Sequence, residues 1–310
     1  MRNLSRIITI MLTAATIMAC GNSYQQTKEI SRMERKRLAR EDSMALKVAV
    51  MPSLDCLPLY IAERAKLFES LGSDIRLKTF TAHMDCDTAL AGTGAEIAMT
   101  DIVRMEYMKK SKGMAIDYVG ATDNHWQLIT SKYSRIRQLK QLDDKMVAMT
   151  RFSVTDMLSD RIADSVKIEK DKLFKVQIND LHVRLMMLIN HELDAVWMAE
   201  PHATQARTGG NKVLADSRKM DIRMGVMAMR TDKMKGKSRD KQLNDLIKAY
   251  NMGCDSINKW GLAHYCDLIK SKCHVDDKTI KRLPKNSRYQ HLKAPRPQDI
   301  EYAQKWINAL

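Results

Sequence analysis

VMPSLDCLPLYIAERAKLFESLG, residues 50–72, is the stretch that decides the fold class. The apolar run LKVAVM (46–51) ends at the beginning of this stretch. Apolar side chains at helical spacing then continue to Gly72. A buried strand that enters a helix through a tight turn is typical of a parallel sheet with crossover helices. Open α/β sheets bind ligands beyond the carboxyl ends of their strands. The turn PSLDCLP (52–58) is therefore expected at the rim of a ligand cleft.

The same alternation of apolar runs and helical patterns continues along the chain. The pattern changes after Gly120, so the chain is expected to leave a first lobe, build a second one and return. The predicted lobes are residues 46–124 with 224–310, and residues 125–223, and the two crossings between them form a hinge. Strands are expected at 46–51, 74–80, 95–101, 114–120, 125–132, 174–180, 194–201, 212–217 and 221–232, followed by helices to the C-terminus. Residues 141–150 are expected to hold a tight turn and a further strand.

The first residues predict export. Two arginines precede an apolar run that is too short for a comfortable membrane span, which is typical of a secretory signal, predicted as residues 1–19. The tetrad IMAC (17–20) resembles a bacterial lipobox, and this implies that Cys20 is lipidated and becomes the mature N-terminus. An ordinary cleaved signal beside an incidental cysteine is the alternative. Residues 20–45 are polar and mixed in charge, and they predict a lipid-anchored tether with no face to bury.

The net charge of +15 limits the possible partners. Residues 1–19 contain two arginines and no acidic residue, so the charge after cleavage is 15 − 2 = +13. A basic balance favours nucleic acid, a membrane surface or an acidic ligand. Export argues against nucleic acid. The basic residues are also scattered among acidic ones, so most of them are expected to be solvated surface.

Four segments together resemble a known family. They are LPLYIAERAKLFESLGSDIRL (57–77), DTALAGTGAEIAMTD (87–101), QLDDKMVAMTRFSVTD (141–156) and LINHELDAVWMAEPHATQARTGG (188–210). In order and spacing they are similar to segments of the periplasmic substrate-binding proteins of the nitrate, sulfonate, taurine and thiamine-pyrimidine ABC importers. The resemblance runs from about Leu46 to the C-terminus. Departures from the family pattern, including the atypical cysteines, leave the ligand open.

The resemblance implies an α/β fold of the type II periplasmic-binding-protein class, with two lobes, each a mainly parallel sheet with flanking helices. It also implies that a small anionic or heteroaromatic ligand is captured in the cleft, that an ABC permease and ATPase are the partners, and that no cofactor is needed. Together with the signal, it implies a periplasmic or extracytoplasmic location at the membrane.

Two other functions remain open at this point. An enzyme on the same fold, like the thiamine-pyrimidine synthases, is the first, although those enzymes act inside cells. A metal-binding or redox lipoprotein is the second. The sequence contains no GxSxG, HExxH or P-loop motif, so it gives little support for catalysis.

The turn TRFSVTD (150–156) is the first candidate for ligand contact. A helix N-terminus offers unpaired amides and a partial positive charge, which suit an anion, and Arg151 adds forked donors. An ordinary capped helix beside an exposed arginine is the alternative. The full set of candidates, drawn from both sides of the cleft, is Ser53, Asp55, Cys56, Thr100, Asp101, Asn124, Arg151, Phe152, Ser153, Val154, Thr155, Trp197 and Glu200.

Several of these candidates have structural roles as alternatives. Asp101 is placed to cap a helix whether or not it meets a ligand. Glu200 precedes a proline and would complement a helix dipole as a first-turn acid. Trp126 and Trp197 fit an aromatic wall of a small-ligand pocket, but core packing explains each of them equally well.

Five cysteines follow Cys20. Cys56 and Cys86 come after the first and second strands, which should be neighbours, so loops close enough for a disulfide are expected. Two free thiols, or a metal site completed by His83 and an aspartate, are the alternatives. None of the cysteines has the short spacing of a confident zinc site, so no metal is predicted.

Overall fold

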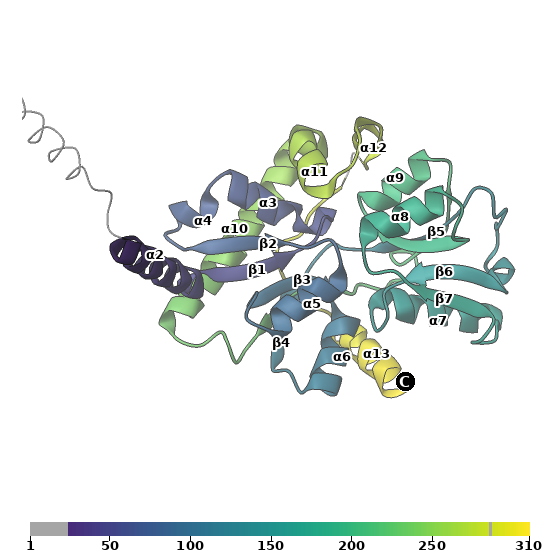
Figure 1. The fold of residues 1–310 in the computed structure, drawn as a ribbon. Coiled ribbons are helices and arrows are strands. Elements are labelled where there is room, and N and C mark those ends of the chain that lie inside the picture. Colours follow the sequence, from purple (N-terminus) through teal and green to yellow (C-terminus); the bar gives the residue numbers. More distant parts are fainter. Residues whose placement is uncertain (1–23, 285–286) are drawn as a thin grey trace, which may run out of the picture. The chain divides into compact units, whose positions relative to one another are not determined.

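The structure of the protein is a computed structural model that describes residues 24–284 and 287–310 (Figure 1). The predicted signal, residues 1–19, and the predicted lipidation site Cys20 lie outside the described residues. Within the described ranges, no helix is both long enough and apolar enough to cross a membrane.

The segment predicted to be a tether is helical. Internal contacts divide the chain into residues up to Ala45 and residues Leu46–Leu310. The first of these units contains α2 (Tyr24–Met44), in which Arg37 pairs with Glu41 one turn later. The described apolar side chains of α2 are exposed, which agrees with the absence of a face to bury in the sequence. A tether stays a prediction.

The second unit contains two five-stranded sheets, which confirms the predicted α/β class. In each sheet four strands run in one direction and one is antiparallel. Sheet 1 has the order β2-β1-β3-β10-β4, from β2 (Ile75–Thr79), β1 (Leu46–Val50), β3 (Ile97–Asp101), β10 (Gly225–Arg230) and β4 (Ile116–Ala121). Sheet 2 has the order β7-β6-β8-β5-β9, from β7 (Leu173–Gln177), β6 (Lys145–Met149), β8 (Ala195–Ala199), β5 (Trp126–Thr130) and β9 (Lys212–Asp216).

Helices cover both faces of each sheet. In the view of Figure 1, α3 lies above β1 and β2 of sheet 1, while α8 and α9 lie above sheet 2 and α7 below it. At sheet 1, α3 packs on α10 and α6 packs on α13. The helices are α3 (Leu57–Arg64), α4 (Leu67–Ser70), α5 (His83–Ala91), α6 (Ile102–Lys112), α7 (Val154–Val166), α8 (Leu181–Ile189), α9 (His202–Thr208), α10 (Lys237–Trp260), α11 (Cys266–Cys273), α12 (Asp277–Arg282) and α13 (Pro297–Asn308), with short 3₁₀ turns η1 (Leu54–Cys56), η2 (Leu139–Leu142) and η3 (Leu262–Tyr265).

The opening stretch folds largely as its pattern predicts. Every residue of β1 is buried, as expected of a strand covered by helices on both faces. The expected single helix is two, α3 and α4, because Lys66 takes the left-handed conformation (φ 52°) and breaks it. Gly253 lets α10 pack closely against α3, since a Cβ at this position would lie 2.4 Å from the carbonyl oxygen of Pro58.

The chain crosses between the sheets in two places. Residues 122–125 connect β4 to β5, and residues 217–224 connect β9 back to β10. The strand expected at 221–232 is shorter, because β10 begins only at Gly225. A Cβ at this glycine would lie 2.7 Å from the Cβ of Asn124, so the two crossings pass close together. The lobe boundaries stay a prediction, and both fall within these crossings.

Candidate functional site

The turn after β1 is rigidly held. Three tyrosine hydroxyls donate to its carbonyl oxygens: Tyr60 to Met51 (2.9 Å), Tyr289 to Leu54 (3.0 Å) and Tyr250 to Asp55 (3.3 Å). These tyrosines come from α3, from the non-helical segment after α12 and from α10, so segments far apart in sequence fix the same turn. This turn is therefore a built part of the molecule and more than a connection.

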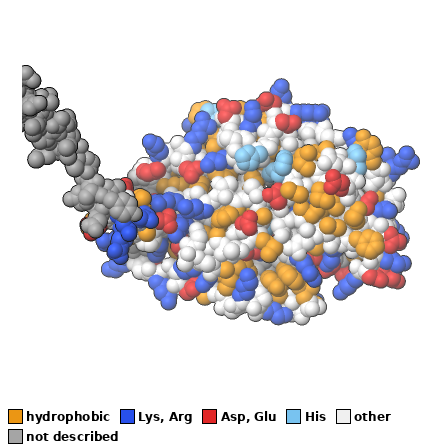
Figure 2. All heavy atoms as spheres, viewed as in Figure 1, with side chains coloured by type: hydrophobic (Ala, Val, Ile, Leu, Met, Phe, Trp, Pro, Cys, Tyr) orange, Lys and Arg blue, Asp and Glu red, His pale blue; other side chains and the backbone are white. Residues whose placement is uncertain are grey.

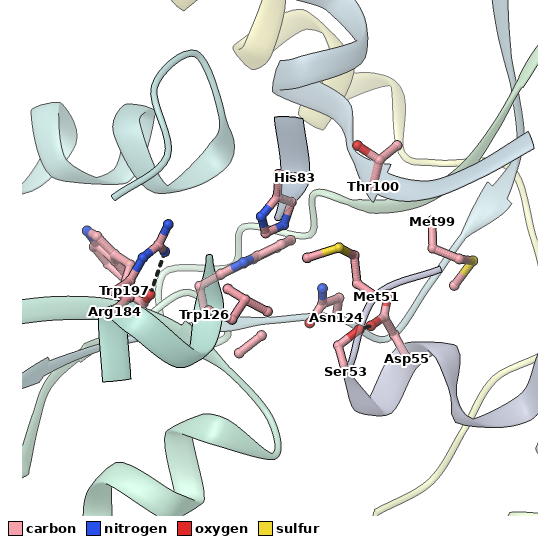
Figure 3. Close-up of a pocket in the computed structure, with 12 residues that line it drawn as sticks. Met51, Ser53, Asp55, His83, Met99, Thr100, Asn124, Trp126, Arg184 and Trp197 are labelled. Carbon is pink, nitrogen blue, oxygen red and sulfur yellow. Dashed lines mark hydrogen bonds between the residues drawn. The ribbon is translucent and has the colours of Figure 1, made fainter. Parts of the chain in front are cut away.

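A pocket opens where this turn faces sheet 2 (Figure 3). The pocket is narrow, with room for only about one or two water molecules. Its walls come from the turn after β1, from the start of α5 and the end of β3, from the first crossing, and from β5, α8 and β8 on the side of sheet 2. The lining residues are Met51, Ser53, Asp55, His83, Met99, Thr100, Asn124, Trp126, Leu181, Arg184, Trp197 and Ala199.

Arg184 supplies the positive charge of this pocket. Its side chain is 1% exposed, and its guanidinium donates only to neutral acceptors: the carbonyl oxygens of Ile178 (2.9 Å from Nε) and Trp197 (3.0 Å from Nη1), and Thr150 Oγ1 (2.6 Å from Nη2). Asp180 acts on the guanidinium from a distance but is not in contact with it. Burial lowers the pKa of Arg184 to about 9, so the group stays charged at neutral pH.

Asp55 supplies a negative charge from the held turn. Its carboxylate accepts from Ser53 Oγ (2.5 Å) and Thr122 Oγ1 (3.2 Å), and no described lysine, arginine or histidine forms an ion pair with it. Burial raises the pKa of Asp55 above its ordinary value, and these hydroxyl hydrogen bonds oppose the rise. Asp123 nearby raises the pKa further.

His83 and Trp126 stand between these two charged residues in Figure 3. The Nδ1 atom of His83 is buried and has no hydrogen-bond partner among the residues that the structure describes. Burial, together with the guanidinium groups of Arg104 and Arg184, lowers the pKa of His83 to about 3, so the imidazole is neutral near pH 7. A neutral imidazole nitrogen can donate to or accept from a ligand.

The N-terminus of α7, the first candidate from the sequence, is filled by the protein's own groups. The Val154 amide donates to Asp101 Oδ1 (3.1 Å), and the Thr155 amide donates to the capping hydroxyl of Ser153 (3.1 Å). The Phe152 amide donates to Asp156 Oδ2 (2.9 Å). A ligand anion would have to displace these partners.

Asp101 joins the two sheets. It caps α6, as predicted, by accepting from the Arg104 amide (3.0 Å), and with the same oxygen it accepts from the Val154 amide at the start of α7. Its other oxygen, Oδ2, is buried and has no partner within the described ranges. Burial raises the pKa of Asp101 to about 7, against the opposing effect of the amide hydrogen bonds.

Arg151 and Phe152 do not line the pocket. Arg151 is exposed, and its carbonyl oxygen accepts from Arg104 Nη1 (2.9 Å). The ring of Phe152 stacks on Tyr107 of α6, with 4.2 Å between ring centroids and 7° between planes. Both residues therefore contact elements that cover sheet 1, and their proposed contact with a ligand stays a prediction.

Glu200 lies at a neighbouring pocket. This second pocket also includes Asp55 and Asn124, so it adjoins the first one at the crossing between the sheets. Glu200 accepts from the Thr204 amide (3.0 Å) and pairs with Arg207 (2.8 Å), so it bonds the first turn of α9 from a position just before that helix and its N-cap Pro201. Its carbonyl oxygen accepts from the Leu54 amide (2.9 Å), a direct link from sheet 2 to the held turn.

Trp197 reaches the pocket from β8. It is fully buried, and its Nε1 donates to Ser159 Oγ (2.9 Å), so it is both a core residue and a lining residue. The pocket thus brings together Ser53, Asp55, Thr100, Asn124 and Trp197 from the predicted set, while Cys56, Asp101, Glu200 and residues 151–155 lie outside it.

The structure does not contain the predicted disulfide between Cys56 and Cys86. Both are buried free thiols. The Cys56 sulfur turns back into its own turn, where it accepts from the Met51 amide (3.4 Å), whereas Cys86 lies within α5. The predicted loop-to-loop approach fails because Cys86 is in a helix and not in a loop.

Alkylation should show the same thiol state in solution. We expect the protein, unfolded in denaturant without a reductant, to be labelled at Cys56, Cys86, Cys254, Cys266 and Cys273, because all five are free. Intact mass followed by peptide mapping measures this, with a reduced sample as the control. A cross-linked peptide containing Cys56 and Cys86 would contradict the structure.

Metal binding receives no support from the described part of the chain. Within residues 24–284 and 287–310, no group of three or more histidine, cysteine, aspartate or glutamate side chains could hold a metal ion.

Over Leu46–Leu310, the face in Figure 2 shows acidic and basic side chains interspersed, as the sequence predicts for solvated surface.

Arg184 is the main site residue that the sequence did not reveal. The buried stripe of α8 is Leu181, Arg184, Leu185 and Leu188, a helical i, i+3, i+4, i+7 pattern with one charged member. An arginine within an apolar stripe was the available signal. It was hidden because Val183 and Met186, on the exposed side of the same helix, are apolar as well.

Comparisons with known proteins bear on the family and the fold of the chain. A family model described as NMT1/THI5 like matches residues 53–258. A comparison with curated proteins found no match.

Solved structures share the fold at low sequence identity. The periplasmic aliphatic sulphonate binding protein SsuA from Escherichia coli has a TM-score of 0.71 at 14% identity, over 86% of this chain and 91% of that one. The alkanesulfonate-binding protein SsuA from Xanthomonas axonopodis pv. citri, bound to MOPS, has a TM-score of 0.73 at 14% identity, over 86% and 91%. The periplasmic nitrate-binding protein NrtA from Synechocystis PCC 6803 has a TM-score of 0.65 at 15% identity, over 83% and 74%. These likenesses confirm the predicted periplasmic-binding-protein fold.

Proposed function

The chain belongs to the NMT1/THI5-like family, and on that premise we propose that it is the solute-binding protein of an ABC importer. It captures one small anionic ligand between two lobes and delivers it to a permease. Its structural neighbours include proteins named for binding sulphonates and nitrate, which supports this role. The observation that carries the proposal is Arg184, a buried cation that lines a pocket between the two sheets and contacts no carboxylate of the described part of the chain.

A buried charge without a counter-ion is costly, and a ligand anion would remove that cost. The guanidinium presents forked donors that suit the two oxygens of a sulfonate or carboxylate. His83 adds a neutral nitrogen that is free to bond, and Trp126 adds an aromatic surface. Anion recognition is therefore the chemistry that this pocket supplies.

Hinge motion accounts for entry of the ligand. The pocket is too narrow for a sulfonate while the two sides are joined by contacts such as Leu54 N to Glu200 O and Val154 N to Asp101 Oδ1. The proposed cycle opens at residues 122–125 and 217–224, admits the ligand and closes through contacts to both lobes. Closure is favourable to the extent that the ligand binds the closed form better than the open one.

A thermal-shift screen tests this function. The purified protein is incubated with sulfonates, carboxylates, nitrate and pyrimidines, and the unfolding midpoint is recorded for each. We expect a saturable rise for at least one small anion, since a ligand that binds only the folded state stabilises it by mass action. Recovery of that anion chemically unchanged after long incubation supports a binding protein, whereas turnover would favour the enzyme alternative.

A lipid anchor at Cys20 completes the proposal. It would hold the protein at the extracytoplasmic face of a membrane, near the permease and its ATPase. We expect Cys20→Ser to give an uncleaved or unlipidated form that no longer partitions into the detergent phase. Equal partitioning of the variant and the parent would show that Cys20 carries no anchor.

A further inference from the structure

We propose that α2 docks on an anionic phospholipid surface through a basic stripe along one side of the helix. This surface is the membrane in which Cys20 is proposed to be anchored, so the inference rests on that part of the proposed function. The basic stripe consists of five exposed residues, Lys28, Arg32, Arg35, Lys36 and Arg40.

Helical spacing places these five residues on one side of α2, which is a single unbroken helix (Figure 1). Successive members of the basic stripe are four, three, one and four positions apart, so they fall within an arc of about 140° and extend over about 18 Å. Glu34 and Glu41 lie on the opposite side of the helix. Glu29 lies inside the arc and Asp42 just beyond its edge, so the stripe keeps a clear excess of positive charge.

The charge of the basic stripe is not balanced by the described part of the chain. None of its members forms an ion pair there, and the Arg35 Nε donates to the carbonyl oxygen of Ser31 in its own helix (3.1 Å). Positions 28, 32, 36 and 40 carry like charges one turn apart, and such spacing destabilises an isolated helix. Arg37, outside the stripe, instead pairs with Glu41. An external anionic surface would therefore stabilise α2.

The position of the basic stripe in the chain identifies the surface. Tyr24, where α2 begins, is four residues after Cys20, which is a chain length of at most about 14 Å. The start of α2 therefore stays within about two Debye lengths of an anchored Cys20, and anionic lipids attract lysine and arginine over such distances. A lipid chain and a basic patch together hold a protein at a membrane more firmly than either one alone. Nucleic acid would also suit a basic helix, but the predicted export argues against it.

Vesicle co-sedimentation tests the inference. The chain from residue 20 onward is prepared with Cys20→Ser, so that it carries no lipid. It is mixed with vesicles of phosphatidylcholine alone, or with vesicles that also contain phosphatidylglycerol at about 30 mol%. We expect the anionic vesicles to bind at least about 30-fold more tightly at low salt, and high salt to abolish this preference because it screens exposed charges.

A stripe variant and a matched control separate the helix from the net charge of the molecule. Replacing all five stripe residues with glutamine should weaken binding to the anionic vesicles by at least about 30-fold, since each basic residue near such a surface contributes roughly fivefold. Glutamine is a good helix former, and circular dichroism checks that the helix content is unchanged. The control should bind within about threefold of the parent, since exposed charges far from the surface are screened. It carries glutamine at five exposed lysines outside α2, Lys140, Lys170, Lys212, Lys219 and Lys278.

Three outcomes would overturn the inference. The first is equal binding of the parent to neutral and anionic vesicles, and the second is a stripe variant that binds like the parent. The third is an equal loss in the control, which would assign the attraction to net charge. The thermal-shift screen tests solute binding and detergent partitioning tests the anchor at Cys20, so failure of the basic stripe is distinguishable from failure of either.

Discussion

Replacing Arg184 with methionine is expected to weaken the binding of an anionic ligand by about 100-fold or more. The reason is that a forked guanidinium makes two charge-assisted hydrogen bonds to such a group, each worth about 1.5–3 kcal/mol. Calorimetric titration of the best anion from the screen measures the loss. The affinity of Arg184→Lys should lie between those of the parent and of Arg184→Met, because lysine keeps the charge but not the forked donors.

The same change is expected to alter stability much less than affinity. The shift of the Arg184 pKa from 12.5 to about 9 means that burying the charge costs roughly 5 kcal/mol. Loss of its bonds to Ile178, Trp197 and Thr150 costs a similar amount, at about 1.5–3 kcal/mol each. Because the two effects oppose each other, the variant should remain folded.

Arg151→Ala is the matched control for this prediction. Arg151 is the arginine that the sequence favours, and it is exposed and outside the pocket. The variant should bind the anion within about twofold of the parent, since an exposed charge contributes little. A large loss with Arg151→Ala and none with Arg184→Met would move the site to the N-terminus of α7.

Asp101→Asn is expected to remove a pH dependence of stability between about pH 4 and pH 7. The folded-state pKa is raised from 3.8 to about 7, so the protonated carboxyl is favoured in the fold. The contribution of this carboxyl to stability is fully present below its pKa in the unfolded chain and is lost as the pH rises through about 7. A shift of about three units corresponds to roughly 4 kcal/mol.

Urea denaturation at several pH values measures this effect. Asparagine keeps an acceptor for the amides of Arg104 and Val154, so the variant should match the parent near pH 4 and exceed its stability at pH 8. Asp276 caps α12, and hydrogen bonds from Thr279 lower its pKa. Asp276→Asn is therefore a control for which the pH dependence of stability has the opposite sign. A parent whose stability rises steadily from pH 5 to pH 8 relative to Asp101→Asn would contradict this role of Asp101.

Much of the fold could be predicted from the sequence because its local signals are strong. Strands such as β1 are short, mostly apolar runs, and each is followed by a helical pattern or a clear turn. Asp101 was recognisable as a helix cap and acts as one. The break at Lys66 was not predictable, because a left-handed lysine has no sequence signature of its own.

The site was only partly predictable. Ser53, Asp55, Thr100 and Asn124 could be found because they lie at or follow strand ends, where ligands of α/β sheets bind. The contact of Asp101 with α7 could not be predicted, because no sequence pattern gives the distance between two helix N-termini. Arg184 was missed because apolar residues occupy both sides of α8 and hide which face is buried.

Diffraction from crystals grown with a bromine-substituted alkanesulfonate tests the central claim most directly. Anomalous scattering locates the sulfur and the bromine independently of the rest of the map. The account predicts sulfonate oxygens within hydrogen-bond distance of the Arg184 guanidinium, in the pocket between the two sheets. A sulfonate bound instead at the N-terminus of α7 beside Arg151, with the pocket at Arg184 unchanged, would contradict it.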